Sequence, residues 1–305
     1  MRMQDRRVRN SVHGWLILDK PQGLTSTQAL GQARRLLDGQ KAGHGGTLDP
    51  LATGLLPLAF GEATKLVPYV MDGDKEYEFT IRWGEQRNTD DAEGTILETS
   101  SERPTLQAIR NALPSFIGTI NQTPPIFSAI KLQGERAYDI ARAGGAPLMS
   151  PRPVVIHDCS CVQILNNDHA TFKVHCGKGV YIRSLARDLA AKLGTYGHIS
   201  QLRRTKVGPF TVNHAISLEK LKELSHNGAA LTALLALRAA LDDIPALTLT
   251  ADEAQRLRAG QSMMIRPQHI DLLEAELIFA EHQGVAVALI EPNAGSFRVV
   301  RGFHF

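Results

Sequence analysis

Residues 43–57, GHGGTLDPLATGLLP, form the most unusual segment of this chain. A run this rich in glycine, with an aspartate directly before a proline, cannot continue a helix or a strand, so an ordered loop is predicted. Pro50 biases Asp49 towards an extended backbone, and the flanking leucines can anchor the loop in a core. The segment therefore presents one carboxylate on a rigid support, as a catalytic acid or nucleophile requires.

The residues alone leave a second interpretation of this loop open. Asp49 could cap the following segment in a purely structural turn, which is a frequent use of aspartate. Two nucleotide-binding loops are excluded by the pattern. A phosphate-binding loop needs a lysine directly after its second glycine, and here there is none. The glycines also lack the spacing of a dinucleotide-binding loop.

Length and composition indicate an ordinary globular protein. The 305 residues, 43% of them hydrophobic, allow one large domain or a main domain with a small one, stable without disulfides or metal. Three cysteines are too few and odd in number for a disulfide framework, which favours a reducing compartment. Residues 1–20 lack the apolar run of a signal sequence, and no stretch is long enough for a membrane span. We therefore expect a cytoplasmic protein with no membrane association.

Positive charge gathers in the middle of the chain. The overall charge is only +3, but residues 124–210 hold 12 Lys and Arg against 5 Asp and Glu. A basic stretch inside a folded domain indicates contact with a polyanion such as nucleic acid. A solvated surface with chance asymmetry would give the same count, so charge alone leaves both interpretations open.

Periodicity predicts an alternation of strands and helices. Along residues 75–83, KEYEFTIRW, the side chains of Tyr77, Phe79 and Ile81 share one face of a strand. Ser26 or Thr27 is expected to cap the first helix. The predicted strands are 14–19, 75–83, 154–165 and 170–176, and the predicted helices are 26–37, 104–113 and 181–193.

Two further regions differ from the rest of the chain in their residue pattern. Residues 123–153 begin with a Pro-Pro pair, end with Pro-Arg-Pro, and hold an amphipathic stretch at 136–142, which indicates an insertion that packs as a flap or arm. After Pro245 a short helix at 252–259 lies among strand-like runs. We place a domain boundary near residue 245, with a small, mostly β module after it.

Motifs in a fixed order accompany the loop. They are LDKPQGLTS at 18–26, GEATK at 61–65, TPPIFSAIK at 123–131 followed by Gly134, Tyr138 and Ala141-Arg142, GVYIRSL at 179–185, and LRR at 202–204. Together they closely resemble the bacterial tRNA pseudouridine-55 synthases, the TruB-type family, over roughly residues 14–220. Phe127 is a departure, because many relatives carry tyrosine there.

The resemblance implies an α/β (α+β) fold. Residues 1–245 are expected to form a catalytic domain on a central, mainly antiparallel sheet with flanking helices, crossed by a cleft. The insertion at about 124–152 would be an RNA-gripping arm. Residues 246–305 resemble the family's small RNA-binding β domain, of the PUA type.

The resemblance also implies an activity: isomerisation of uridine to pseudouridine at position 55, in the T loop of tRNA. The partner would be the T arm and T loop of tRNA, bound by a monomer without cofactor, metal or obligatory protein partner. Two alternatives stay open. One is a non-catalytic RNA-binding or RNA-folding protein, and the other is a different target, such as another tRNA position or ribosomal RNA.

Roles for individual residues follow from the resemblance. Asp49 corresponds to the essential aspartate, and Arg183 to an arginine that pairs with it and keeps it ionised and aimed. Tyr77 corresponds to an aromatic residue that stacks on the target base. By pattern alone, Arg183 would be a surface arginine and Tyr77 a core residue. The other expected site residues are Tyr181 and Leu202 as pocket walls, Lys20 as a support, and His44, Lys131, Arg136, Arg142 and Asp91 as RNA-binding residues.

The chemistry is consistent with these roles. Pseudouridine formation breaks the C1′–N1 bond, rotates the uracil and joins C1′ to C5. A carboxylate can attack C1′, as in glycosidases, or assist loss of the 2′ proton, and the sequence leaves both routes open. The uridine must first be flipped out of its loop. Stacking worth about 1–3 kcal/mol per base would then retain the detached uracil.

Two metal patterns are rejected. His157, Cys159 and Cys161 share a strand face, but the first and third would lie about 13 Å apart along a strand, too far for one tetrahedral zinc. Adding His175 or Cys176 has no support in the pattern. Asp90, Asp91 and Glu93 lack the downstream glutamate of a calcium loop, so a solvated turn is the simplest interpretation. The resemblance implies another, in which this loop borders the cleft and Asp91 contacts RNA or nearby basic residues. We expect no metal site.

Overall fold

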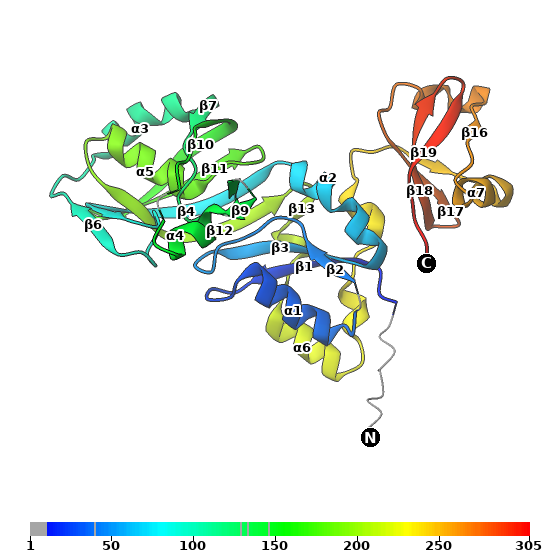
Figure 1. The fold of residues 1–305 in the computed structure, drawn as a ribbon, viewed down its shortest axis with the longest axis horizontal. Coiled ribbons are helices and arrows are strands. Elements are labelled where there is room, and N and C mark those ends of the chain that lie inside the picture. The colour runs from blue at the N-terminus through cyan, green and yellow to red at the C-terminus, as the bar shows by residue number, and fades with distance from the viewer. Residues whose placement is uncertain (1–10, 40, 129, 133, 146) are drawn as a thin grey trace.

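The computed structural model describes residues 11–305 except 40, 129, 133 and 146, and at 131 and 136 it describes only the backbone. A ten-stranded sheet runs through the first two thirds of the chain (Figure 1). Its order is β14 (Ile216–Ser217), β1 (Gly14–Lys20), β3 (Thr53–Phe60), β12 (Gly197–Val207), β4 (Lys75–Trp83), β11 (His169–Cys176), β10 (Arg152–Asn166) and β7 (Gly118–Gln122), with β2 (Ala42–His44) paired to β3 and β13 (Phe210–Thr211) to β12.

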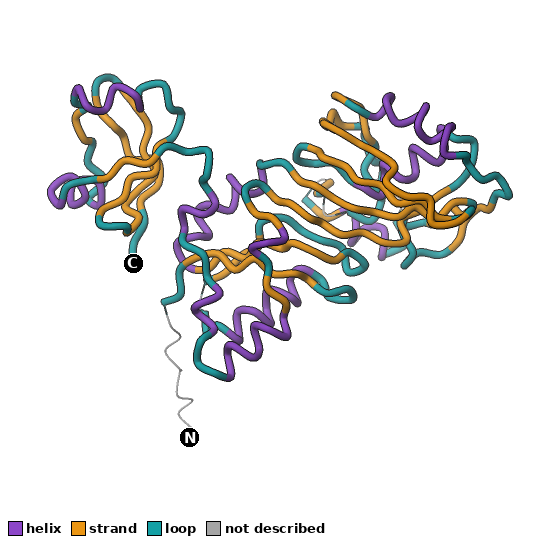
Figure 2. Tube along the Cα trace, turned by 180° about the vertical axis from the view of Figure 1, so that it is seen from behind, coloured by secondary structure: helices purple, strands orange, loops and turns teal. Residues whose placement is uncertain are grey.

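Most neighbouring strands in this sheet are antiparallel. The parallel pairs are β14 with β1 and β3 with β12, and the second of these joins the strands by only two residue pairs. The sheet is therefore narrowly connected between β3 and β12, where strands far apart in the sequence meet. The backbone trace from behind shows the strands running through both halves of the sheet, with helices alongside them (Figure 2).

Helices cover the sheet at both ends. At the end of the sheet formed by β14, β1 and β3, α1 (Ser26–Leu36) packs against α6 (Leu218–His226). In the other half lie α3 (Leu106–Ala112) and α5 (Ile182–Lys192), and α2 (Val67–Asp72) precedes β4. A small hairpin of β5 (Glu85–Arg87) and β6 (Ile96–Thr99) flanks the loop at 88–95. Short 3-10 helices lie at Gly61–Leu66, Leu113–Phe116, Val212–His214, Ala230–Ala233, Leu237–Ala240 and Pro267–Leu272.

The N-cap of the first helix lies at least one residue earlier than we expected. Thr25 is the N-cap, and its hydroxyl accepts a hydrogen bond from the backbone N–H of Gln28, whose side chain accepts in return from Thr25. This reciprocal arrangement satisfies two N–H groups at the start of the helix. The predicted cap at Ser26 or Thr27 is wrong, and the Ser26 hydroxyl is left free for another partner.

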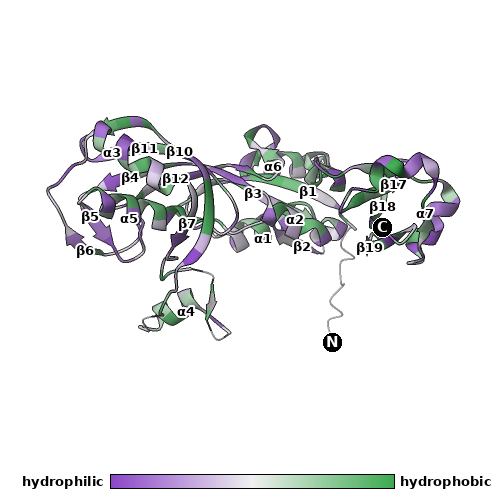
Figure 3. Ribbon diagram, turned by 90° about the horizontal axis from the view of Figure 1, so that it is seen from above, coloured by the Kyte–Doolittle hydropathy of each residue, from purple (hydrophilic) through white to green (hydrophobic). Residues whose placement is uncertain are grey.

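The insertion forms a small unit of its own. It contains β8 (Lys131–Leu132), β9 (Glu135–Arg136) and α4 (Ala137–Arg142), and it projects from one side of the main sheet (Figure 3). The predicted arm-like insertion thus has secondary structure of its own.

A second sheet follows residue 245. Its order is β15 (Ala246–Thr248), β17 (Ile278–His282), β18 (Val285–Asn293), β19 (Ser296–Gly302) and β16 (Met263–Met264), with α7 (Ala251–Arg258) beside it. Residues inside this module form a separate hydrophobic core. Phe279 and Phe303 also pack in a shared cluster with Trp15 and Phe210 of the main domain. The expected mainly antiparallel sheet, flanking helices and small C-terminal β domain are confirmed.

The GEATK motif at residues 61–65 connects the two parts. The ammonium of Lys65 donates to the carbonyl of Gly302 at 2.7 Å, and the backbone N–H of His304 donates to the Glu62 carboxylate at 2.8 Å. Burial raises the pKa of Glu62, but hydrogen bonds from Lys65 and His304 outweigh it and leave the pKa lowered. This motif therefore anchors the end of β19.

Across the described residues, no helix is both long and apolar enough to cross a membrane.

Candidate active site

The loop that carries Asp49 is fixed from inside the protein. The buried Ser26 hydroxyl accepts a hydrogen bond from the N–H of Leu48 at 2.8 Å and donates to its carbonyl at 3.0 Å. Leu48 and Leu51 are buried on either side of Asp49. Ser26 thus holds the residue directly before the aspartate, which the sequence did not predict.

Arg204 on β12 holds the two ends of the same loop. Its guanidinium is buried and donates to the carbonyls of Gly46 at 3.0 Å, Thr47 at 3.4 Å and Leu55 at 2.8 Å. At Gly54, with φ of +99°, a Cβ atom would lie 2.2 Å from the Arg204 carbonyl oxygen, so only glycine fits. No role was predicted for Arg204 from the sequence. In the sequence, Arg204 stood out only as part of the LRR motif at 202–204.

Arg183 forms an ion pair with Asp49. Its Nε lies 2.9 Å from Oδ2 of Asp49, and the guanidinium also donates to the carbonyls of Thr89 and Phe127, each at 2.9 Å. The Arg183 side chain is 6% exposed, whereas that of Asp49 is 36% exposed. Arg183 therefore joins the Asp49 loop, the 88–95 loop and the base of the arm, while the carboxylate stays open to a ligand.

Asp91 turns inward instead of outward. It is buried, its Oδ1 accepts from the Thr89 hydroxyl at 2.6 Å, and its Oδ2 lies 3.7 Å from Arg183. Its neighbour Asp90 pairs with Arg187 at 2.9 Å, and burial raises the pKa of Asp90 to about 6. The solvated turn expected here is wrong. The burial of Asp91 favours contact with the nearby arginine over direct contact with RNA.

Lys20 supports the loop from the side of β1. The residue is fully buried, and its ammonium donates to the carbonyls of Leu24 at 2.8 Å, Pro21 at 2.9 Å and Pro50 at 3.4 Å. Burial lowers the pKa of Lys20 to about 8, and the nearby charge of Asp49 partly opposes this shift. Lys20 thus contacts the residue after Asp49.

The lowered pKa of Lys20 predicts a pH-dependent stability. Between about pH 8 and the ordinary lysine pKa of 10.5, the unfolded chain holds a proton that the folded chain has lost. Stability therefore rises with pH across this window. We expect the free energy of unfolding of the wild type to increase, relative to Lys20→Met, from pH 8 to pH 10.5 in urea titrations. A difference that stays flat over this range would contradict the assignment.

Two tyrosines lie near Asp49. Tyr77 on β4 is opposite Arg204 on β12, and Tyr181 precedes α5; both side chains are half-buried. Burial raises the pKa of both phenols, and the negative charge of Asp49 adds to each shift. The backbone of Tyr181 is held by the buried Gln122 amide, which accepts from its N–H at 2.8 Å and donates to its carbonyl at 3.1 Å. Both phenols are thus kept protonated beside the carboxylate.

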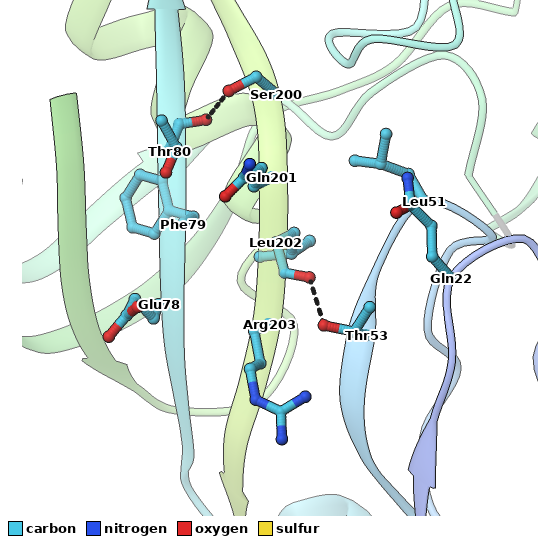
Figure 4. A pocket seen from close by; sticks show the side chains of 10 residues that line it. All are labelled: Gln22, Leu51, Thr53, Glu78, Phe79, Thr80, Ser200, Gln201, Leu202 and Arg203. Atoms are coloured by element: carbon cyan, nitrogen blue, oxygen red, sulfur yellow. Dashed lines mark hydrogen bonds between the residues drawn. The ribbon is translucent and has the colours of Figure 1, made fainter. Parts of the chain in front are cut away.

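A cavity of about 260 Å³ opens next to the Asp49 loop, where β3 and β12 meet. Figure 4 shows Leu51 and Gln22 facing Gln201 and Leu202 across it. The Thr53 hydroxyl donates to the Leu202 carbonyl at 3.4 Å and closes one end. Its remaining lining residues are Glu78, Phe79, Thr80, Ser200 and Arg203. Leu202 therefore lines a cavity beside the Asp49 loop, but Asp49, Tyr77 and Arg183 do not line it.

The residues expected to bind RNA differ in exposure. His44 lies on β2, half-buried, and its Nδ1 has no hydrogen-bond partner among the described residues. Burial, with the charge of Arg204, lowers its pKa and favours neutral imidazole. Arg142 is exposed at the end of α4 and lies 4.5 Å from the ring of Tyr138. The side chains of Lys131 and Arg136 lie outside the described part of the chain.

Known families match most of this domain. The model described as "TruB family pseudouridylate synthase (N terminal domain)" matches residues 34–182, and that described as "tRNA pseudouridylate synthase B C-terminal domain" matches 183–245. Among solved structures, "Structure of H/ACA RNP bound to a substrate RNA containing 2'-deoxyuridine" aligns with a TM-score of 0.72 and 22% identity. It covers 96% of this chain and 86% of that one, and shows a common fold.

Curated relatives match the chain along its whole length. One from Bradyrhizobium diazoefficiens, named tRNA pseudouridine synthase B, is 51% identical and covers 99% of this chain and 88% of its own. Another of that name, from Caulobacter vibrioides, is 49% identical and covers 99% of both. The chain therefore belongs to the TruB family of pseudouridylate synthases.

Proposed function

We propose that this enzyme isomerises uridine to pseudouridine in tRNA, that its target is position 55 in the T loop, and that Asp49 is the catalytic residue. The observation that carries the proposal is the Asp49–Arg183 ion pair, in which a buried guanidinium holds a partly exposed carboxylate. The full-length relatives named tRNA pseudouridine synthase B support the substrate class.

Each part of the site contributes one property to the reaction. The Asp49 carboxylate acts at the ribose of the target uridine, either by attack on C1′ or by assisting loss of the 2′ proton. Tyr77 stacks on the uracil while the base is detached, and Leu202 and Tyr181 close the pocket around it. Arg183 aims the carboxylate, whereas Lys20 and Arg204 hold the loop on which it sits. The proposed reaction uses only these side chains of the chain itself.

Substrate entry requires that the uridine leave its stacked position in the T loop. His44, neutral and half-buried near the loop, would fill the gap that the flipped base leaves. The arm at 124–152 would grip the T arm, and the module at 246–305 would act as a PUA-like RNA-binding domain. We further propose that the enzyme works as a monomer in the cytoplasm without an obligatory protein partner.

The activity can be measured directly. We expect the purified chain to release tritium from tRNA labelled at uridine C5, because C5 loses its hydrogen when it bonds to C1′. Mapping of the product should place pseudouridine at position 55. Release from another tRNA position or from ribosomal RNA would correct the target. Tight tRNA binding without release would favour the alternative of an RNA-binding or RNA-folding protein.

The arm makes a separate prediction about affinity. Replacing Lys131 and Arg136 by glutamine should weaken tRNA binding and reduce the slope of log K against log salt by up to about 0.9 for each phosphate that is no longer neutralised. Filter binding at several salt concentrations measures this slope. Lys220→Gln, in an exposed ion pair on α6, is the matched control. An unchanged slope in the arm variant would refute a phosphate contact for both residues.

A further inference from the structure

A second polar cluster brings together two histidines and an aspartate. Asp74 lies in the turn between α2 and β4, His157 lies on β10, and His175 lies on β11. Nε2 of His157 is 3.3 Å from Oδ1 of Asp74, and Nε2 of His175 is 3.3 Å from Oδ2. The three potential ligand atoms all lie within 4.8 Å of one another.

A strand irregularity creates this convergence. Ile156 pairs with Cys176 and Asp158 pairs with His175, so His157 is the extra residue of a β-bulge in β10. A bulge re-aims the side chain that it carries. It brings the imidazole of His157 to 4.7 Å from that of His175, measured between ring centroids. The spacing of His157, Cys159 and Cys161 in sequence gave no sign of this arrangement.

The two contacts to Asp74 have lengths that fit metal ligation better than hydrogen bonding. Charge-assisted N–H···O bonds are about 2.7–2.9 Å long, shorter than both contacts to Asp74. Ligand atoms bonded to one tetrahedral zinc at about 2.0–2.1 Å lie about 3.3 Å apart. In addition, the His175 side chain is 37% exposed but its Nε2 atom is buried, and the 3.3 Å contact of this atom with Asp74 is not a hydrogen bond. A buried polar atom without a partner destabilises the fold unless a ligand satisfies it.

We propose that Asp74, His157 and His175 form a binding site for a divalent transition-metal ion of the zinc class, distinct from the Asp49 site. Two imidazoles and one carboxylate suit zinc, and three protein ligands leave a fourth position for water. Magnesium is a poor fit, because it prefers oxygen ligands in octahedral geometry. The ion would join the start of β4, the strand that also carries Tyr77, to the neighbouring strands β10 and β11.

Zinc titration of the untagged, EDTA-treated full chain tests the site. In competition with a chromophoric chelator, we expect one zinc ion bound per chain and no displacement by millimolar Mg²⁺. Zinc should also raise the melting temperature, because a ligand that binds only the folded state stabilises it. Cobalt(II) in place of zinc should give the visible absorption of a four-coordinate ion, without a thiolate charge-transfer band.

Variants locate the bound ion. Asp74→Asn keeps the shape of the side chain but removes its charge, and His175→Ala removes the imidazole. Each variant should weaken zinc binding at least about 10-fold and abolish the rise in melting temperature. The matched control is His169→Ala at the other end of β11, where the imidazole contacts Asn166 at 3.0 Å. It should bind zinc like the wild type. The proposal is overturned if the wild type shows no saturable binding, if Asp74→Asn binds zinc normally, or if cobalt reports thiolate ligation.

Discussion

An Asp49→Asn variant is expected to bind tRNA with nearly unchanged affinity and to lose at least about 10⁴-fold in kcat, the scale seen when a catalytic nucleophile is removed. Asparagine has the same shape and keeps an oxygen for Arg183, so the loop should retain its conformation. It lacks the negative charge that either route at the ribose requires. Single-turnover tritium release and tRNA binding, measured on one preparation, separate these two effects.

A second carboxylate in an arginine pair provides the control for this experiment. Asp19 accepts two hydrogen bonds from Arg203, at 2.9 and 2.8 Å, outside the set of residues proposed to act on the ribose. Asp19→Asn should therefore keep kcat within a few-fold of the wild type. If Asp49→Asn forms pseudouridine at the normal rate, Asp49 is not the catalytic residue.

Arg183→Lys should have the second largest effect. Lysine preserves the charge but lacks the planar fork with which Arg183 reaches Asp49 and two carbonyls at once. Each buried group left unpaired destabilises the fold by about 1–3 kcal/mol. A carboxylate misplaced by about 1 Å can lower kcat by about 10²-fold. We expect both changes, visible in thermal melts and in single-turnover rates.

Arg187→Lys distinguishes aiming of the carboxylate from general stability. Arg187 lies one turn further along α5, pairs with Asp90 at 2.9 Å and donates to the Thr123 carbonyl at 2.9 Å. Its replacement should lower the melting temperature comparably, yet change kcat only a few-fold. Equal losses of kcat in the two variants would show that Arg183 acts through stability alone.

The sequence predicted the elements whose patterns are local. The alternation in β4 and the apolar spacing of α5 gave both elements to within a residue or two of their observed bounds. It did not predict β3 or β12. The first, TGLLPLAF, is buried along nearly its whole length, so it has no alternation to detect. The second carries three basic residues, and two register shifts against β4 interrupt its period.

The residues of the candidate site also fall into a predicted group and a missed group. Asp49 and Arg183 were predicted because they lie in motifs, and Tyr77 because it corresponds to an aromatic residue of the family; their proximity then follows from the fold. Ser26, Gln122 and Arg204 were missed because their contacts join segments far apart in the sequence. No local pattern shows that a buried guanidinium on β12 will hold carbonyls of a loop that lies far earlier in the chain. Asp91 was expected to contact RNA or nearby basic residues, but no local pattern showed that it would be buried beside Arg183.

The hydrogen bonds between Arg204 and the Asp49 loop also constrain the order in which the domain folds. Residues 46 and 47 are made early, but their carbonyls find this partner 158 and 157 residues later in the chain. Contacts of such long sequence separation are slow to form, because a large loop must close first. During synthesis the N-terminal strands can pair with each other before β12 exists, yet the aspartate cannot reach its final position. Catalytic competence therefore arrives late, after the second half of the sheet has joined the first.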